Sequence, residues 1–340
     1  MVWVAGSPSS TVDRTYVLYF CYGIVSAAEV KALYPRVMSS QRCDEQAALV
    51  ALLRARPDGL SWPDIMGEVL ESGSALDVWE RHIVPALLAH PHEPDPMDQA
   101  LIDLETWTGE GITTLTILDQ DYPDRLRGVH QAPPILFARG QLEPGDRAVS
   151  VVGSRKASDR GLSIADGVAR ALVRDGITVL AGLAEGIDTA AHRAAIDAGG
   201  RTVAVIGTGI RRYFPRQNEK LQDSIPAHGL VLSQFWPDAP PTRYSFPMRN
   251  ATMSGYGFAT VVVEAGEHSG ARIQARLAVE HGRPVILTDL VVRKNKWATE
   301  LMGRPGVHRA DALGEVVDII RDIDGKRHAA VDTLRNALAL

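Results

Sequence analysis

The sequence predicts an α/β fold: an extended Rossmann-like, doubly wound and mainly parallel sheet, preceded by a small helical domain. From residue 148 onward, short β-branched runs alternate with amphipathic segments of helical length, which is the pattern of βαβ units. Gly176, Gly199 and Gly282 stand where the intervening helices should end. The predicted strands are Ala148–Val152, Ile177–Ala181, Thr202–Ile206, Leu230–Phe235, Thr260–Glu264 and Pro284–Thr288.

A helical domain is expected ahead of the sheet. Apolar residues recur at helical spacing and predict short helices at Asp44–Arg56, Trp62–Ser72 and Ala75–Leu88, followed by a linker with three prolines at residues 90–96. Met38 is an alternative start of the native chain. The expected organisation is an uncertain N-terminal extension at 1–37, an acidic helical domain and linker at 38–110, the Rossmann-like domain at 111–325 and a C-terminal tail at 326–340.

Charge is distributed unevenly along the chain. The 340 residues carry a net charge of −5, and 45% hydrophobic and 23% charged residues are typical of a globular protein. Residues 41–147 hold 8 basic and 19 acidic side chains, whereas residues 148–340 hold 25 basic and 20 acidic ones. The C-terminal part is therefore the one suited to a polyanion.

Cysteine usage and hydropathy indicate the compartment. The two cysteines, Cys21 and Cys43, exclude a disulfide framework and a cysteine-based zinc site. The apolar run at residues 16–28 is shorter than the ~20 residues that a membrane span needs. We therefore expect a cytoplasmic protein without membrane contact.

Four glycine-bearing loops follow predicted strands, and in a doubly wound sheet such loops meet at one edge. Each loop opens a helix, whose N-terminal N–H groups attract anions, and glycine lets the backbone approach a ligand closely. The loops therefore predict a phosphate-binding groove. They are Gly153-Ser154-Arg155-Lys156, Gly182 to Asp188 with Gly186, Gly207-Thr208-Gly209, and Glu264 to Gly270 with Ser269.

Two runs beside these loops combine arginines with aromatic residues. The first contains Arg211, Arg212, Tyr213, Phe214 and Arg216, and the second contains Arg243, Tyr244, Phe246, Arg249 and Asn250. Cations for phosphates and rings for unstacked bases suit a single-stranded nucleic acid.

Common cofactor and catalytic motifs are absent from the sequence. No G-x-G-x-x-G, G-x-x-x-x-G-K-[ST] or G-x-S-x-G stretch occurs, and the ten histidines lack metal-ligand spacing. His192 is expected to be structural. The sequence thus predicts no cofactor, no metal and no catalytic residue.

The loops and runs resemble those of the DprA/Smf family over about residues 111–320. The motifs are Asp121 to Leu126, Gly153-Ser154-Arg155, Gly182 to Asp188 with Ala191-His192, Gly207-Thr208-Gly209 with Phe214-Pro215 and Asn218, Phe246 to Asn250, and Val263-Glu264-Ala265 with Ser269-Gly270. The resemblance implies an extended Rossmann fold whose matching residues, Asn218 included, bind single-stranded DNA. It also implies a homodimer that delivers DNA to the RecA recombinase during uptake of foreign DNA, in competence and transformation.

The chain departs from the family pattern at three positions. Ala251 replaces a usual second arginine, Gln234 a usual acidic residue, and Gln274 the threonine of the S-G-x-x-x-T-A stretch.

The leading interpretation is a single-strand-binding protein that is not an enzyme. The alternative is a sensor of a nucleotide-derived ligand, or a hydrolase of N-glycosidic bonds on the same scaffold, with Glu264 polarising a ribose. The hydrolases resemble one another through P-G-G-x-G-T-x-x-E, which is absent here, and a nicotinamide oxidoreductase lacks its fingerprint.

Overall fold

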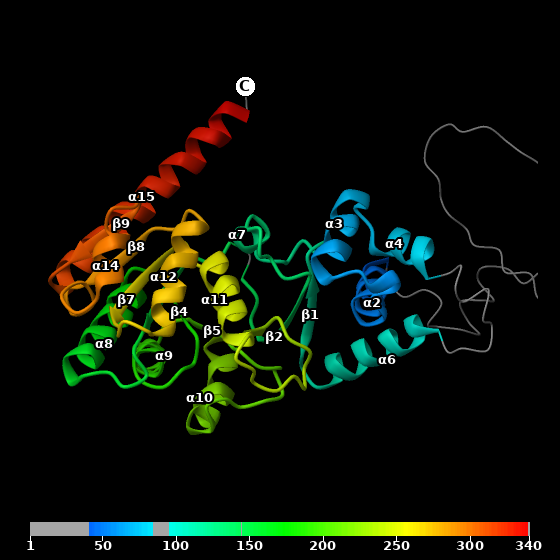
Figure 1. The fold of residues 1–340 in the computed structure, drawn as a ribbon, viewed down its shortest axis with the longest axis horizontal. Helices are drawn as coiled ribbons and strands as arrows, with labels where there is room; N and C mark the ends of the chain where they lie inside the picture. The colour runs from blue at the N-terminus through cyan, green and yellow to red at the C-terminus, as the bar shows by residue number, and fades with distance from the viewer. Residues whose placement is uncertain (1–40, 84–94, 144, 339–340) are drawn as a thin grey trace, which may run out of the picture.

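A nine-stranded mixed sheet forms the centre of the molecule (Figure 1). The computed structural model describes residues 41–83, 95–143 and 145–338. The spatial order is β1-β2-β6-β5-β4-β3-β7-β8-β9. The strands β3 to β9 all run parallel, and β1 and β2 add an antiparallel edge beside β6. The strands are β1 Thr113–Thr116, β2 Ile135–Gly140, β3 Ala148–Gly153, β4 Thr178–Ala181, β5 Thr202–Val205, β6 Gly229–Ser233, β7 Ala259–Glu264, β8 Val285–Thr288 and β9 Val307–Ala310.

The predicted fold class is confirmed. All six expected strands are present, as β3 to β8, with ends that differ by at most two residues. The strands β1, β2 and β9 were not predicted. In β9 three of four residues are at least partly exposed, so this edge strand lacks the apolar run by which a buried strand is recognised.

The order of the strands creates a switch point between β3 and β7. The helix α8 (Asp159–Arg174) follows β3, and α12 (Gly270–Glu280) follows β7. Alternate residues of β3 separate two cores: Val149 and Val151 pack in the core with α8, and Ala148 and Val152 in the core with α12. The two helices therefore leave the sheet toward opposite faces, which opens a crevice at the carboxyl ends of these strands.

The N-terminal helices pack on the antiparallel edge of the sheet (Figure 1). They are α2 (Gln41–Ala55), α3 (Trp62–Ser72), α4 (Ala75–His82) and the unpredicted α6 (Pro96–Gly109). Trp107 of α6 meets Phe137 of β2 edge-on, with ring centroids 5.0 Å apart. This contact belongs to one hydrophobic core shared by the helices and the sheet.

The last helix, α15 (Leu313–Leu338), begins against α8 and extends away from the body (Figure 1). Val316 and Ile320 are buried, whereas His328 to Val331 are exposed. The expected boundary at residue 325 lies inside this helix. The remaining helical elements are η2 Pro57–Gly59, α7 Asp124–Arg127, η3 Arg216–Asn218, α9 Ile187–Asp197, α10 Glu219–Ser224, η4 Ile225–Ala227, α11 Ser245–Tyr256, α13 Asp289–Val292 and α14 Lys296–Leu301.

Some expectations fall outside the described residues. These are the extension at 1–37 with Cys21, the end of the third predicted helix and most of the 90–96 linker. Among the residues that the structure describes, no helix has the length and apolar character needed to cross a membrane.

The core shared by α6 and the sheet predicts how two substitutions in α6 affect stability. Trp107 is 4% exposed, so Trp107→Ala should lower the free energy of unfolding by about 3–5 kcal/mol through loss of burial and a residual cavity. Ile102, on the same helix, is 49% exposed, and Ile102→Ala should have an effect below about 0.5 kcal/mol. Denaturant unfolding of both variants checks this. Equal effects would contradict a core shared between α6 and the sheet.

Candidate nucleic-acid interface

Two adjoining cavities lie at the carboxyl edge of the sheet. The switch-point cavity, of about 580 Å³, lies where the loops after β3 and β7 meet α11 and α12. The aromatic cavity, of about 330 Å³, lies beside it, against the loops after β4 and β5. They share Arg155, Ala184, Phe246 and Arg249, and together they are called the groove below.

Most of the predicted site residues line the groove. Of the four glycine-bearing loops, the one that begins at Gly207 reaches the groove through Gly207 alone. Each of the other three contributes several lining residues. The predicted residues that line it are Gly153, Ser154, Arg155, Lys156, Gly182, Gly207, Phe214, Arg216, Phe246, Arg249, Asn250, Ser269 and Gly270.

Six predicted residues do not line the groove, because the fold uses them elsewhere: Gly186, Thr208, Gly209, Arg211, Arg212 and Asn218. Arg211 forms ion pairs with Glu110 and Asp238, and Arg212 donates to the Asp238 carbonyl at 3.1 Å. Asn218 is buried and its amide donates to the Leu183 carbonyl at 2.9 Å.

Arg249, from the second aromatic run, lies inside the fold. The sequence predicted Arg249 as a cation for phosphates, but residues from Ser245 onward form α11, and Arg249 is 6% exposed. Its Nη1 donates to the carbonyls of Gly182 and Val205, the latter at 2.8 Å, and its Nε to Asn250 Oδ1 at 3.0 Å. Burial lowers the pKa of Arg249 to about 10, so the guanidinium stays charged near neutral pH.

Asp188 supports the same strand ends from the first turn of α9. Its carboxyl group is buried and accepts from the N–H of Gly182 at 2.9 Å and of Ala184 at 3.4 Å. Burial raises the pKa of Asp188, while the Arg249 charge and these backbone donors oppose that shift. Asp188 and Arg249 thus fix the loop after β4 from two sides.

Glycines in these loops make room for protein groups. A Cβ at Gly182 would lie within 2.7 Å of three atoms of the Arg249 guanidinium, and one at Gly207 within 2.9 Å of the Phe246 ring. The close approach that the sequence assigned to a ligand is therefore made first by Arg249 and Phe246.

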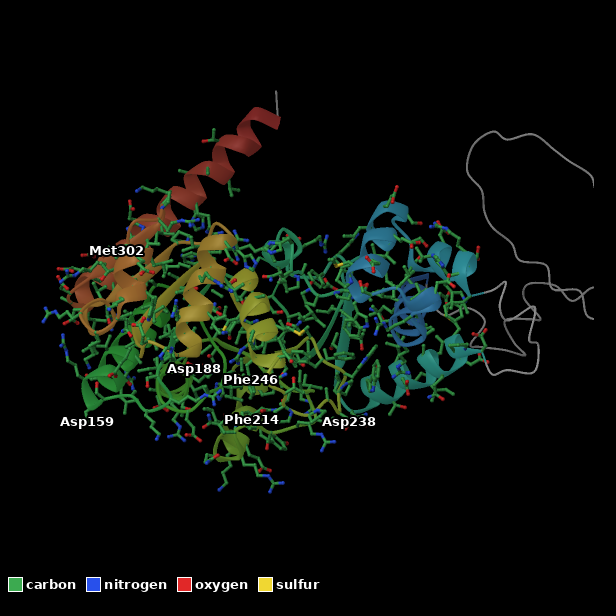
Figure 2. The ribbon with its side chains drawn as sticks, in the orientation of Figure 1. Asp159, Asp188, Phe214, Asp238, Phe246 and Met302 are labelled. Carbon is green, nitrogen blue, oxygen red and sulfur yellow. The ribbon has the colours of Figure 1, made fainter. Side chains whose placement is uncertain are left out.

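The exposed rim of the groove carries three cations and one partly exposed carboxylate, Glu185, which lines the aromatic cavity. Arg155, Lys156 and Arg216 are exposed, and their side chains form no ion pair with any other described residue. The Arg155 guanidinium lies 5.6 Å from the centre of the Phe246 ring, and Phe246 lies 5.3 Å from Phe214 (Figure 2). Because Phe214 is 36% exposed, cations and an accessible aromatic pair stand side by side.

Glu264 has a structural position. Its carboxylate accepts from the backbone N–H and the hydroxyl of Ser158, both at 2.9 Å, at the start of α8. It is 8% exposed and does not line the groove. His192 is also part of the core: it is fully buried, bonds to the Thr202 hydroxyl at 2.7 Å, and burial lowers its pKa to about 3.

Sequence reasoning missed several lining residues. Asp188 was part of a quoted motif without a role, and Gln274 was noted only as a departure from a pattern. His268 and Gln217, both exposed at the rim, carried no signal that could have identified them. Among the described residues, no three His, Cys, Asp or Glu side chains are placed to hold a metal ion.

The sequence matches the model of a known protein family. The model of DNA recombination-mediator protein A matches residues 113–321, more than half of the chain. The protein belongs to this family. The resemblance stated from the sequence is thereby confirmed.

Individual members are similar to the chain. The DNA processing protein DprA of Bacillus subtilis is 35% identical over 184 residues, which cover 54% of this chain and 62% of that protein. The matched part thus spans less than two thirds of that relative. The X-ray structure of DprA from Streptococcus pneumoniae superposes with a TM-score of 0.63 at 30% identity, over 81% of this chain and 97% of that one. DprA from Helicobacter pylori shares the fold, with a TM-score of 0.54 at 20% identity over 62% and 96% of the two chains.

Because Arg249 packs against Gly182, a larger side chain at Gly182 should destabilise this DprA-family protein. Gly182→Ala should lower the free energy of unfolding by about 1–3 kcal/mol, because the new methyl group collides with the buried guanidinium. Gly266, also in the groove wall, has open space where a Cβ would stand, with no atom within 4 Å, so Gly266→Ala should change stability by less than about 1 kcal/mol. Thermal and denaturant unfolding compare the two. Equal stabilities would show that the strand ends are not packed around Arg249.

Proposed function

We propose that the groove binds single-stranded DNA and that the protein, without catalysing a reaction itself, acts in the uptake and recombination of foreign DNA. The observation that carries the proposal is the rim, where three cations without an ion-pair partner among the described residues line the same groove as an accessible aromatic pair. A single-stranded DNA binding mode is described for DprA from Helicobacter pylori, with which this chain shares the fold.

Phosphates account for the cationic part of the rim. Arg155 and Lys156 flank the switch-point cavity, and Arg216 lies across the aromatic cavity. A strand that runs from one cavity to the other passes all three. Near the first cavity, the N-terminus of α12 adds its backbone dipole, with the Ser269 hydroxyl accepting from the N–H of Ala271 and the Ser269 carbonyl from the N–H of Arg272.

Bases account for the aromatic part. Phe214 and Phe246 lie with ring planes at 44°, beside the Arg155 guanidinium. A base can stack on such a ring only when it is not paired inside a duplex, and stacking contributes about 1–3 kcal/mol per base. The pairing of cations with rings therefore favours a single strand over a duplex.

Partners belong to the same proposal. As in the resemblance from which it starts, the protein acts in the cytoplasm as a homodimer and presents the bound strand to the RecA recombinase. Membership in the recombination-mediator family supports this role.

The residue that the hydrolase alternative would use lies outside the groove. Glu264 is held by Ser158 outside the groove, so its carboxylate is not available to polarise a ribose there. A sensor of a small nucleotide ligand would use the same phosphate-binding rim but would not need both cavities.

Salt dependence and one variant test the proposal together. With three phosphate contacts at the rim, the slope of log K against log salt on single strands should be about −2. Arg155→Ala should weaken binding by about 1–3 kcal/mol and make the slope shallower by about 0.7, because one charge-assisted contact is lost. Fluorescence anisotropy with a labelled oligonucleotide measures both quantities.

The control variant is Arg212→Ala. Arg212 is exposed like Arg155 and was also predicted to bind DNA, from the first arginine–aromatic run, but it lies outside the groove. Its loss should leave affinity and slope unchanged. Equal effects of the two variants, or none from Arg155→Ala in a folded protein, would reject the rim as the DNA-binding site.

A further inference from the structure

The switch-point cavity contains a buried amide without a partner. Gln274 lies on α12, one turn beyond Ala271, and its side chain lines the cavity while being 1% exposed. Neither its Nε2 nor its Oε1 has a hydrogen-bond partner among the described residues. An unsatisfied buried polar group is unfavourable by about 1–3 kcal/mol, so a partner for this amide would be stabilising.

The neighbouring polar groups of the cavity are already used. Asn250 accepts from Arg249 Nε and donates to the Gly270 carbonyl at 3.3 Å. Ser269 caps α12 through the N–H of Ala271 at 3.0 Å. Among the described residues, Gln274 is therefore a buried side chain of this cavity whose donor and acceptor both remain for a ligand.

The surroundings of Gln274 suit a flat, uncharged group. Val152, Met253 and Ala271 form an apolar wall of the cavity, and each is at most 6% exposed. Arg155 and Lys156 are exposed at the rim of the cavity, whereas the third cation that lines it, Arg249, is buried and its guanidinium donates to the carbonyls of Gly182 and Val205 and to Asn250. A phosphate would stay at the rim, whereas a base attached to it can enter.

We propose that one base of the bound strand enters the switch-point cavity, where the Gln274 amide reads its edge and selects adenine. The edge that Gln274 reads is the Hoogsteen edge, where adenine alone among the four bases offers an adjacent donor and acceptor, N6–H and N7, which a glutamine amide binds through two hydrogen bonds. The flexible side chain turns toward the cavity to make this contact. The inference rests on the proposed function and adds base selectivity to a rim whose phosphate contacts carry no sequence information.

The position of Gln274 in the family pattern strengthens the inference. The S-G-x-x-x-T-A stretch would place a threonine here. A threonine hydroxyl is a single group and cannot form the side-by-side pair of bonds that an amide forms. The selectivity is thus a property of this chain's own residue.

The test compares oligodeoxynucleotides of equal length that contain only adenine, thymine, cytosine or guanine. The protein should bind the adenine strand between about fivefold and a hundredfold more tightly than the thymine strand, as one bidentate pair allows. Gln274→Met keeps the length of the side chain and removes its hydrogen-bonding groups. It should abolish the preference by weakening binding of the adenine strand to the level of the thymine strand. Gln274→Thr is the second variant, with the same expected loss.

The outcomes separate the two proposals. Even affinity of the unmodified protein for all four strands, a preference retained in Gln274→Met, or an equal loss on every strand would overturn the role of Gln274 while single-strand binding stands. Absence of binding to any single strand would reject the proposed function and this inference with it. Unfolding curves confirm folding, and Gln274→Met should be no less stable, because it removes an unpaired polar group from the interior.

Discussion

The groove depends on one buried cation, Arg249. A charge inside a protein must be compensated, and here its partners are backbone carbonyls at the ends of β4 and β5, an adjacent amide and the nearby Asp188. Each of these partners belongs to a different element, so the guanidinium holds α11 against two strand ends. Gly182 is required because the guanidinium occupies the place where a side chain would start. The shape of the groove is therefore fixed before any ligand arrives, which lowers the entropic cost of binding.

The internal role of Arg249 determines which residues remain for DNA. Arginines that the fold uses, such as Arg211 with its two carboxylates, contribute to structure, whereas the cations of the rim form no ion pair with another described residue and can neutralise phosphates. This division explains how a chain with a net charge of −5 can offer a polyanion a binding surface. The acidic N-terminal helices lie at the antiparallel edge of the sheet, whereas the cations of the rim gather at the carboxyl ends of the parallel strands.

Much of this arrangement follows from sequence, because local periodicity and glycine positions specify the parallel strands and the loops after them. The edge strands β1, β2 and β9 and the helix α6 were missed because short or partly exposed elements have weak periodicity. Burial was the harder quantity to predict. Arg249 stands in a run of arginines and aromatic residues that predicted a phosphate contact, and only the tertiary fold shows that it is buried in the wall of the groove. Likewise, Gln274 was visible as a departure, but its unpaired amide depends on what surrounds it in three dimensions.

The central claim, that the groove is built for a single strand, is tested most directly by comparing ligands on the unmodified protein. Affinities for one oligonucleotide, for the duplex that contains it and for its mononucleotides should be measured by competition at a single salt concentration. The account predicts that the single strand binds most tightly, because only an unpaired strand can place phosphates on the rim and bases on the rings together. Equal or tighter binding of the duplex, or complete displacement of the strand by mononucleotides at similar concentrations, would contradict it.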